Sequence, residues 1–118
     1  MAGAGGDWKD FYAAAERGDL HCVRYHLRNG VDVDYQHPEV MQSALFISVL
    51  HRHEAVARAL LEHGADPNLP AELGSVTPLQ AARQARSEAL QALLVAFGAR
   101  TSRPAARSPW WLRWLPQV

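Results

Sequence analysis

Apolar and polar positions recur along the chain with a period of 34 residues. Glycine stands at positions 30, 64 and 98, and three residues before each glycine the chain carries Leu27, Leu61 and Val95. Positions 11, 45 and 79 are also apolar, and no gap is needed to keep the three copies aligned. Self-similarity at such a period predicts a stack of like structural units. We place three units at about residues 9–42, 43–76 and 77–100.

Each unit is expected to hold two short helices and an extended turn. Thr77 and Pro78 are typical of a helix start, because threonine caps free amides and proline needs no hydrogen there; Ser43 can cap the second unit. The expected first helices span about 8–16, 44–51 and 78–85, and the second helices about 20–29, 54–63 and 88–97. Each second helix carries an apolar stripe and ends at a glycine suited to a left-handed conformation. These stripes include Val56, Ala57, Leu60 and Leu61, and then Leu90, Leu93, Leu94 and Val95. The sequence therefore predicts an all-α solenoid of three helix-turn-helix units.

The composition indicates one domain with a tail of different character. With 118 residues, 48% of them apolar, the chain has the size of a single domain. Residues 1–99 contain 8 basic and 12 acidic side chains, whereas residues 100–118 contain four arginines and no acid. We expect a flexible N-terminus at 1–6, a repeat domain at 7–100 and a basic, Trp-rich tail at 101–118. The balanced total charge argues against a nucleic-acid partner.

Cysteine usage and hydropathy indicate where the protein works. No run of 18 apolar residues is present, so no membrane-spanning helix is expected, and the first residues do not have the pattern of a secretory signal. Cys22 is the only cysteine and cannot form an internal disulfide. This is typical of a reducing compartment, so we expect the cytoplasm, with the nucleus as the alternative.

The chain does not carry the motifs of common enzymes or metal sites. His53 and Glu54 begin a metalloprotease-like pattern, but Ala57 stands where the second histidine is required. The six histidines are therefore expected in turns and on the surface. Cys22 aligns with Val56 and Leu90, which predicts a small buried side chain rather than a nucleophile. We expect no catalysis, no cofactor and no metal.

Two segments resemble ankyrin repeats. Residues 77–82 read Thr-Pro-Leu-Gln-Ala-Ala, and residues 59–68 read Ala-Leu-Leu-Glu-His-Gly-Ala-Asp-Pro-Asn. Residues 15–20 and 27–30 of the first unit are similar to the same pattern. The resemblance covers about residues 9–100 and implies a rigid stack that binds another macromolecule without catalysis.

The chain departs from the family pattern at three places. The usual histidine after Thr-Pro-Leu is replaced by Tyr12, Phe46 or Gln80. The glycine between the two helices remains only at Gly18 and is replaced by arginine at 52 and 86. The spacing of 34 rather than 33 predicts one extra residue in each finger-like turn, near 36–42 and 70–76.

The resemblance implies contacts on a concave surface made by the first helices and the fingers. The candidate side chains at helix ends are Glu16, Arg17, Leu50, His51, Gln84, Asn29, His63 and Phe97. The candidates in the fingers are Tyr35, Gln36, His37, Glu39, Leu73 and Val76. Leu50 has two interpretations, an exposed contact residue or a side chain packed on the neighbouring unit. The expected partner is another protein, bound by a monomer.

The tail packs Trp110, Trp111 and Trp114 into five positions. It can fold back as a cap over the last unit, it can place its tryptophans in a partner's pocket, or residues 108–115 can make weak contact with a membrane surface. Two alternative functions follow. One is a peripheral membrane protein anchored by the tail. The other is a small kinase inhibitor of the ankyrin type, which Asp7-Trp8 and residues 13–18 resemble.

Overall fold

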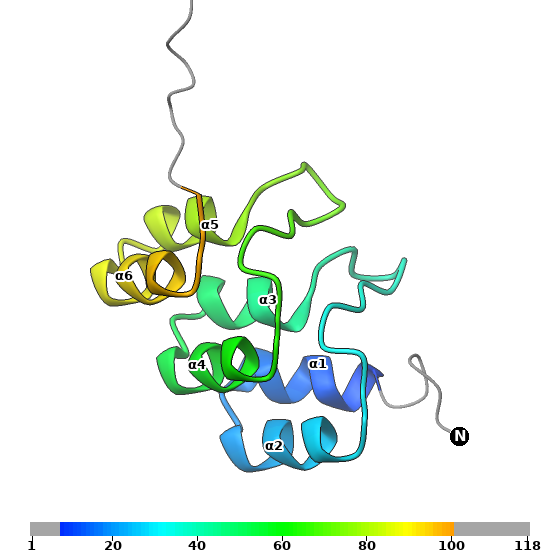
Figure 1. Ribbon diagram of the computed structural model, residues 1–118. Helices are drawn as coiled ribbons and strands as arrows, with labels where there is room; N and C mark the ends of the chain where they lie inside the picture. The colour runs from blue at the N-terminus through cyan, green and yellow to red at the C-terminus, as the bar shows by residue number, and fades with distance from the viewer. Residues whose placement is uncertain (1–7, 101–118) are drawn as a thin grey trace, which may run out of the picture.

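The computed structural model describes residues 8–100, so the predictions for residues 1–6 and for the tail at 101–118 lie outside the described residues. Within 8–100 the chain forms six helices and no strand (Figure 1). The helices are α1 (Trp8–Arg17), α2 (Leu20–Arg28), α3 (Ala44–Leu50), α4 (Glu54–Glu62), α5 (Pro78–Gln84) and α6 (Glu88–Ala96). The all-α prediction is confirmed, and every expected helix boundary is within one residue of the observed one. None of these six helices is long and apolar enough to cross a membrane.

The helices form two layers. Helices α1, α3 and α5 pack side by side in one layer, and α2, α4 and α6 form the second, so each pair stacks on the next (Figure 1). Two long loops return from the second layer to the first. We call residues 30–43 the first finger and residues 64–77 the second finger, and both project from the same edge of the stack (Figure 1).

A continuous apolar core joins the three pairs. Leu45 and Val49 of α3, Leu60 of α4, and Leu90 and Leu94 of α6 are almost completely buried. Burying a leucine side chain of this kind contributes about 1.5–3 kcal/mol to the free energy of unfolding, compared with leaving it exposed. Because these side chains lie at the contacts between pairs as well as within them, the stability of one pair depends on its neighbours.

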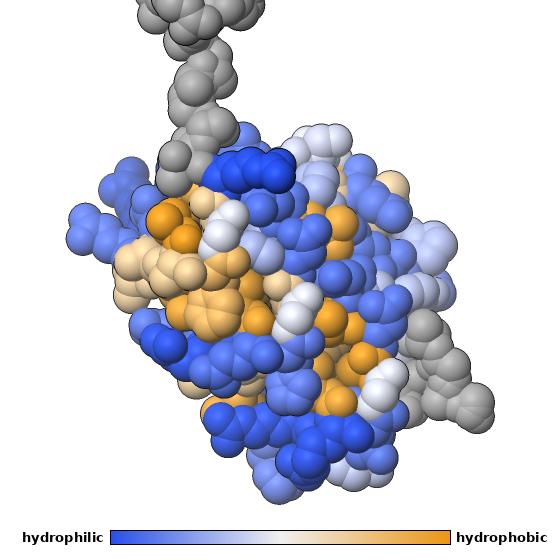
Figure 2. Space-filling view, in the orientation of Figure 1, coloured by the Kyte–Doolittle hydropathy of each residue, from blue (hydrophilic) through white to orange (hydrophobic). Residues whose placement is uncertain are grey.

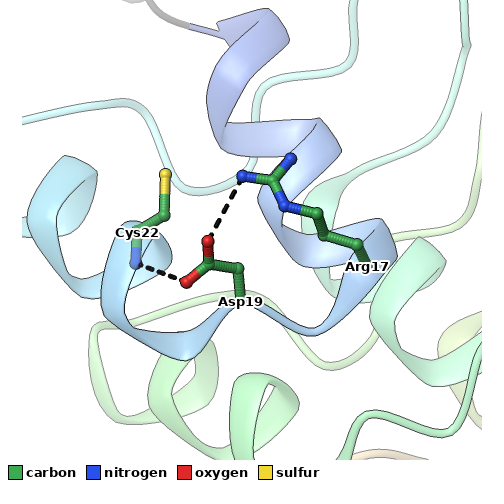
Figure 3. A network of polar contacts seen from close by, with 3 residues as sticks. All are labelled: Arg17, Asp19 and Cys22. Carbon is green, nitrogen blue, oxygen red and sulfur yellow. Dashed lines mark hydrogen bonds and ion pairs between the residues drawn. The ribbon is translucent and has the colours of Figure 1, made fainter.

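Polar side chains fix where the helices begin. Ser43 and Thr77 accept hydrogen bonds from the amides of Phe46 and Gln80, as the sequence predicted. Gln80 completes a capping box, because its side chain accepts from the Thr77 amide at 2.9 Å. At α2, an Asp19 carboxylate oxygen accepts from the Cys22 amide at 3.1 Å, and the other pairs with Arg17 at 3.3 Å (Figure 3).

Two side chains expected in the core lie at the ends of the stack instead. Cys22 is only half-buried, whereas its counterparts Val56 and Leu90 are buried. Val95 is 45% exposed, although Leu27 and Leu61 at the same register are buried. The prediction of burial was wrong at both positions, because the end pairs have a neighbour on one side only within residues 8–100.

His26 also differs from expectation, since it lies in the interior rather than on the surface. It is 5% exposed and meets the rings of Phe11 and Tyr25 edge-on, with centroids 6.2 and 5.3 Å away. Within the described residues its Nδ1 atom has no hydrogen-bond partner. An apolar ring environment explains its position, but the structure gives no account of the unpaired nitrogen.

The turn between α1 and α2 is in close contact with the next pair. Gly18 has a φ of 81°, and His53 lies against it. His53 Nε2 donates to the backbone carbonyl of Glu16 at 2.8 Å. This bond joins the end of α1 to the start of α4, so the glycine and the histidine together set the spacing between the first two pairs.

Replacing Gly18 with Ala is expected to lower the free energy of unfolding more than the same change at Gly30. Both glycines have positive φ, where a side chain costs about 1–2 kcal/mol. A Cβ at 18 would meet His53 Nδ1 at 2.7 Å, whereas nothing lies within 4 Å of a Cβ at 30. Urea unfolding of Gly18→Ala and Gly30→Ala measures the difference.

The His53→Ala background serves as the control for this comparison. There the two glycine substitutions are expected to cost about the same, because the clashing ring is gone. An excess cost of Gly18→Ala that persists without the ring would show that His53 does not set this spacing.

Candidate protein-binding surface

The structure separates the predicted contact residues into two groups. The helix-end group, Glu16, Arg17, Leu50, His51 and Gln84, lies where α1, α3 and α5 end. The finger group contains Tyr35, Gln36, His37, Glu39, Leu73 and Val76. The two groups lie at opposite ends of the first-layer helices, because the fingers enter where these helices begin (Figure 1).

The helix-end group is polar except at Leu50. Glu16, Arg17, His51 and Gln84 are exposed, whereas Leu50 is half-buried and packs against the core. Of the two interpretations of Leu50, the structure therefore supports packing. His51 Nε2 lies 3.9 Å from Glu16 Oε2, so neighbouring units contact each other through these two side chains.

An aromatic cluster holds the first finger against α1. The Trp8 and His37 rings are stacked with centroids 3.9 Å apart, and Trp8 also meets Tyr35 and Tyr12 at 6.5 Å. Burial, and then the nearby Glu16 carboxylate, raise the pKa of Tyr12, whose neutral hydroxyl donates to Gln42 Oε1 at 2.8 Å. Together, these contacts fix the first finger in one position.

The sequence did not predict that Trp8 positions the first finger. Trp8 was considered only as part of a kinase-inhibitor resemblance, yet it joins α1 to the first finger. The available signal was its type, because a side chain as large as tryptophan gains much by packing against other rings.

Gln36 bridges the two fingers. Its Nε2 donates to the Pro70 carbonyl at 3.1 Å, and its Oε1 accepts from the Glu72 amide at 2.9 Å. The Leu73 amide donates to the Met41 carbonyl at 3.3 Å. The Leu73 side chain is 60% exposed. It therefore projects from a loop whose backbone is hydrogen-bonded to the first finger at Glu72 and Leu73.

The left-handed residues of the fingers lie where the extra residue was expected. Met41 and Ser75 both have a φ of 56° and stand 34 positions apart, in the ranges 36–42 and 70–76. The two fingers share this left-handed position, but the second finger also has a positive φ of 82° at Gly74, so the two turns are not identical.

His63 lies outside both groups, and Val76 is the one finger-group residue that packs against the core. His63 is exposed at the end of α4, and its ring Nδ1 lies 3.3 Å from the Ala59 carbonyl of the same helix. Val76 is half-buried against the core. Trp110, Trp111 and Trp114 lie outside the described residues.

The bases of the fingers are linked by a repeated hydrogen bond. Asp34 Oδ1 accepts from the Asp66 amide at 3.0 Å, and Asn68 Oδ1, 34 positions later, accepts from the Arg100 amide at 2.8 Å. Asn68 also donates through Nδ2 to the Gly98 carbonyl at 3.0 Å. Burial raises the pKa of Asp34, and the carboxylates of Asp66 and Asp32 raise it further against the effect of the amide bond.

Within residues 8–100, no group of three or more His, Cys, Asp or Glu side chains is placed to hold a metal ion. The surface instead consists of exposed polar helix ends, cross-linked loops and one projecting leucine.

Comparison with known families decides what this stack is. The family model for ankyrin repeats, in three copies, matches residues 11–104. The chain belongs to the ankyrin repeat family. No curated protein matches it by sequence.

Solved ankyrin repeat domains share the fold. A domain from Acinetobacter baumannii is 32% identical over 76% of this chain, with a TM-score of 0.70. The ankyrin repeat domain of human ASB11 is 33% identical over 80% of this chain, with a TM-score of 0.71. The matches cover 47% and 42% of those chains, so this protein spans less than half of their length.

Replacing Asp34 with Asn is expected to stabilise the ankyrin stack at pH 7 by up to about 1 kcal/mol, the size of screened surface interactions. A raised carboxyl pKa means that folding becomes less favourable as pH rises through it. The amide removes this charge, keeps the acceptor for the Asp66 amide and can copy the bonds of Asn68. Urea unfolding between pH 3 and pH 7 measures the effect, with the pH range set around the usual aspartate pKa of about 3.9.

Asp19→Asn is the matched control and should act in the opposite direction. The bond from the Cys22 amide, and the Arg17 guanidinium beside it, lower the pKa of Asp19. Its ionised form therefore stabilises the fold above that pKa, and the benefit is lost as pH falls through it. If Asp34→Asn destabilised the protein at pH 7, the electrostatic account of the finger bases would be wrong.

Proposed function

We propose that this chain is a non-catalytic interaction module that binds another protein through its two fingers and the helix-end group. Ankyrin repeats generally bind other proteins, and the family is generally non-catalytic. The observation that carries the proposal is the bridge made by Gln36, which holds the two fingers together while Leu73 projects from the second.

The bridged fingers support binding because they are already ordered. A loop that must be immobilised on binding costs about 0.5–1.5 kcal/mol for each side chain that is fixed. Here the Trp8–His37 stack and the Gln36 bonds fix the first finger before any partner arrives. The surface can therefore recognise a partner of matching shape at low entropic cost.

Leu73 supplies the apolar anchor of this surface. It is the most exposed of the large apolar side chains within residues 8–100. Protein interfaces generally have an apolar core surrounded by a polar, solvent-accessible rim. The neighbouring Glu72 and Ser75 are exposed and can form that polar surround.

Two arginines in the turns that follow α3 and α5, beside the helix-end group, support this region as part of the contact. Arg52 and Arg86 have φ of 62° and 59° in the turns where the first pair carries Gly18. A non-glycine residue there costs about 1–2 kcal/mol. Both arginines are exposed, and arginine is favoured at binding hot spots. A role in recognition would offset the conformational cost of having arginine instead of glycine in these turns.

Free Cys22 is consistent with a reducing compartment, so we propose the cytoplasm or nucleus as the location. We propose a protein partner, with no nucleic acid and no cofactor, bound by a monomer.

Replacing Leu73 with Glu is expected to raise the Kd for the protein partner about tenfold or more, which corresponds to at least about 1.4 kcal/mol of lost contact energy. The fold should be unaffected, because only the Leu73 backbone is hydrogen-bonded. Affinity purification with quantitative mass spectrometry identifies the partner, and calorimetric titration of the purified pair measures Kd.

Tyr25→Glu is the matched control. Tyr25 is 53% exposed and lies on α2, in the layer away from the fingers. It should leave Kd unchanged. A partner lost from Tyr25→Glu and retained by Leu73→Glu would place the binding surface on the second layer and overturn the proposal.

A further inference from the structure

The outer face of α6 differs from the same face of the two earlier second-layer helices. Several exposed positions of the second-layer helices stand 34 residues apart and so occupy the same place in each unit. At three of these positions α2 and α4 carry polar or charged residues: Arg24 and Arg58, Arg28 and Glu62, Asn29 and His63. In the third unit the same three positions hold Ala92, Ala96 and Phe97, and all are exposed. An exposed apolar face of this kind often marks a surface that another segment or molecule covers.

Another ankyrin repeat stacked on α6 would not cover this face. Positions 24, 28, 58 and 62 stay exposed in α2 and α4 although another pair is stacked beyond each of them. Only Val95 is at a position that stacking covers, since Leu27 and Leu61 at this register are buried. The apolar outer residues therefore require a cover that lies across the side of α6.

These residues form one surface with Val95. Ala92, Val95 and Ala96 are spaced by three and four positions, so they share one side of the helix, and Phe97 follows at its end. Val95 and Phe97 are 45% and 37% exposed. Figure 2 shows apolar residues gathered over α6, whereas polar residues dominate much of the rest of this view.

We propose that residues 108–115 of this chain dock on the outer face of α6. This segment reads Ser-Pro-Trp-Trp-Leu-Arg-Trp-Leu and carries three tryptophans, each able to bury about 150–250 Å². It is the most aromatic stretch of the chain and is joined to α6 through a short connection. The proposal does not depend on the function proposed for the fingers.

The connection is long enough and begins in the right place. Ala99 is buried, and its amide donates to the Leu94 carbonyl at 2.9 Å, so the chain leaves the stack beside the end of α6. Trp110 stands ten positions after Arg100, and this stretch can span up to about 33–36 Å. Helix α6, with nine residues, is about 13 Å long. The tryptophans can therefore reach every position on its outer face.

Charge complementarity favours the same occupant. Glu88 is the only charged residue of α6, and Glu62 is exposed at the end of the adjacent α4. The tail carries Arg103, Arg107 and Arg113 and no acid. An arginine among the tryptophans can approach these carboxylates while the rings cover the alanines.

The test is the full-length double variant Ala92→Arg, Ala96→Glu. It gives α6 the residues that α4 already carries at those positions, Arg58 and Glu62, so the stack is expected to fold. In the unmodified chain the tail tryptophans should be shielded, with a low acrylamide quenching constant and blue-shifted emission. In the double variant quenching should increase and the emission should shift to the red.

Ala55→Arg is the control, because it adds a cation to an exposed alanine on α4 instead of α6 and should leave quenching unchanged. Trp8 lies on α1 at the other end of the stack, so its contribution is the same in all these proteins. Replacing Trp110, Trp111 and Trp114 together with Ser should lower Tm by about 4–8 °C, the shift expected for a domain of this size when modest burial is lost.

Equal quenching in the unmodified chain and the α6 double variant would overturn the proposal. Light scattering over a dilution series gives the oligomeric state. Tryptophan shielding found only at concentrations where the chain is a dimer would also overturn the proposal, since a second copy would then be the cover. Tryptophans that become shielded only with vesicles of anionic lipid would overturn it in favour of a membrane contact.

Discussion

No helix pair of this chain can exclude water from its apolar side chains without a neighbour, and the rest of the structure follows from that constraint. The middle pair has a neighbour on both sides, and Leu45, Val49 and Leu60 are almost completely buried. Cys22 and Val95, in the end pairs, are only partly covered. Stacking therefore determines the stability of the ankyrin domain and keeps the first-layer helices in a fixed row. A fixed row is what a surface for recognition needs.

Polar contacts hold the two fingers in fixed positions relative to the core. The bonds from Asp34 to the Asp66 amide and from Asn68 to the Arg100 amide tie each finger base to the next unit. Gln36 then ties the first finger to the second, and Trp8 ties the first finger to α1. The exposed Leu73 thus stands on a loop that is fixed by several independent contacts, which is the physical basis for proposing it as an anchor.

Much of the fold could be predicted from the sequence because equivalent residues of the three units stand 34 positions apart with no gap. Ser43 and Thr77 marked helix starts through local hydrogen bonding, which depends on few distant residues. Burial at the stack ends could not be read this way, since the period assigns Val95 the same environment as Leu61 although only one of them has a neighbour beyond it. Leu50 kept two interpretations for a different reason, because it is the last residue of α3, where the period does not show whether a side chain packs on the core or faces solvent. The Trp8–His37 stack joins residues far apart in the chain, and no periodic signal reports such a contact.

Native-state hydrogen exchange of the full chain with Leu45→Ala tests the stacking account most directly. Leu45 is 1% exposed on α3, between α1 and α5. If the pairs are stable only together, truncating it should speed exchange of the slowest amides in α1–α2 and α5–α6 as well as in α3–α4. Acceleration confined to α3 and α4 would show that each pair is stable on its own and would contradict the account.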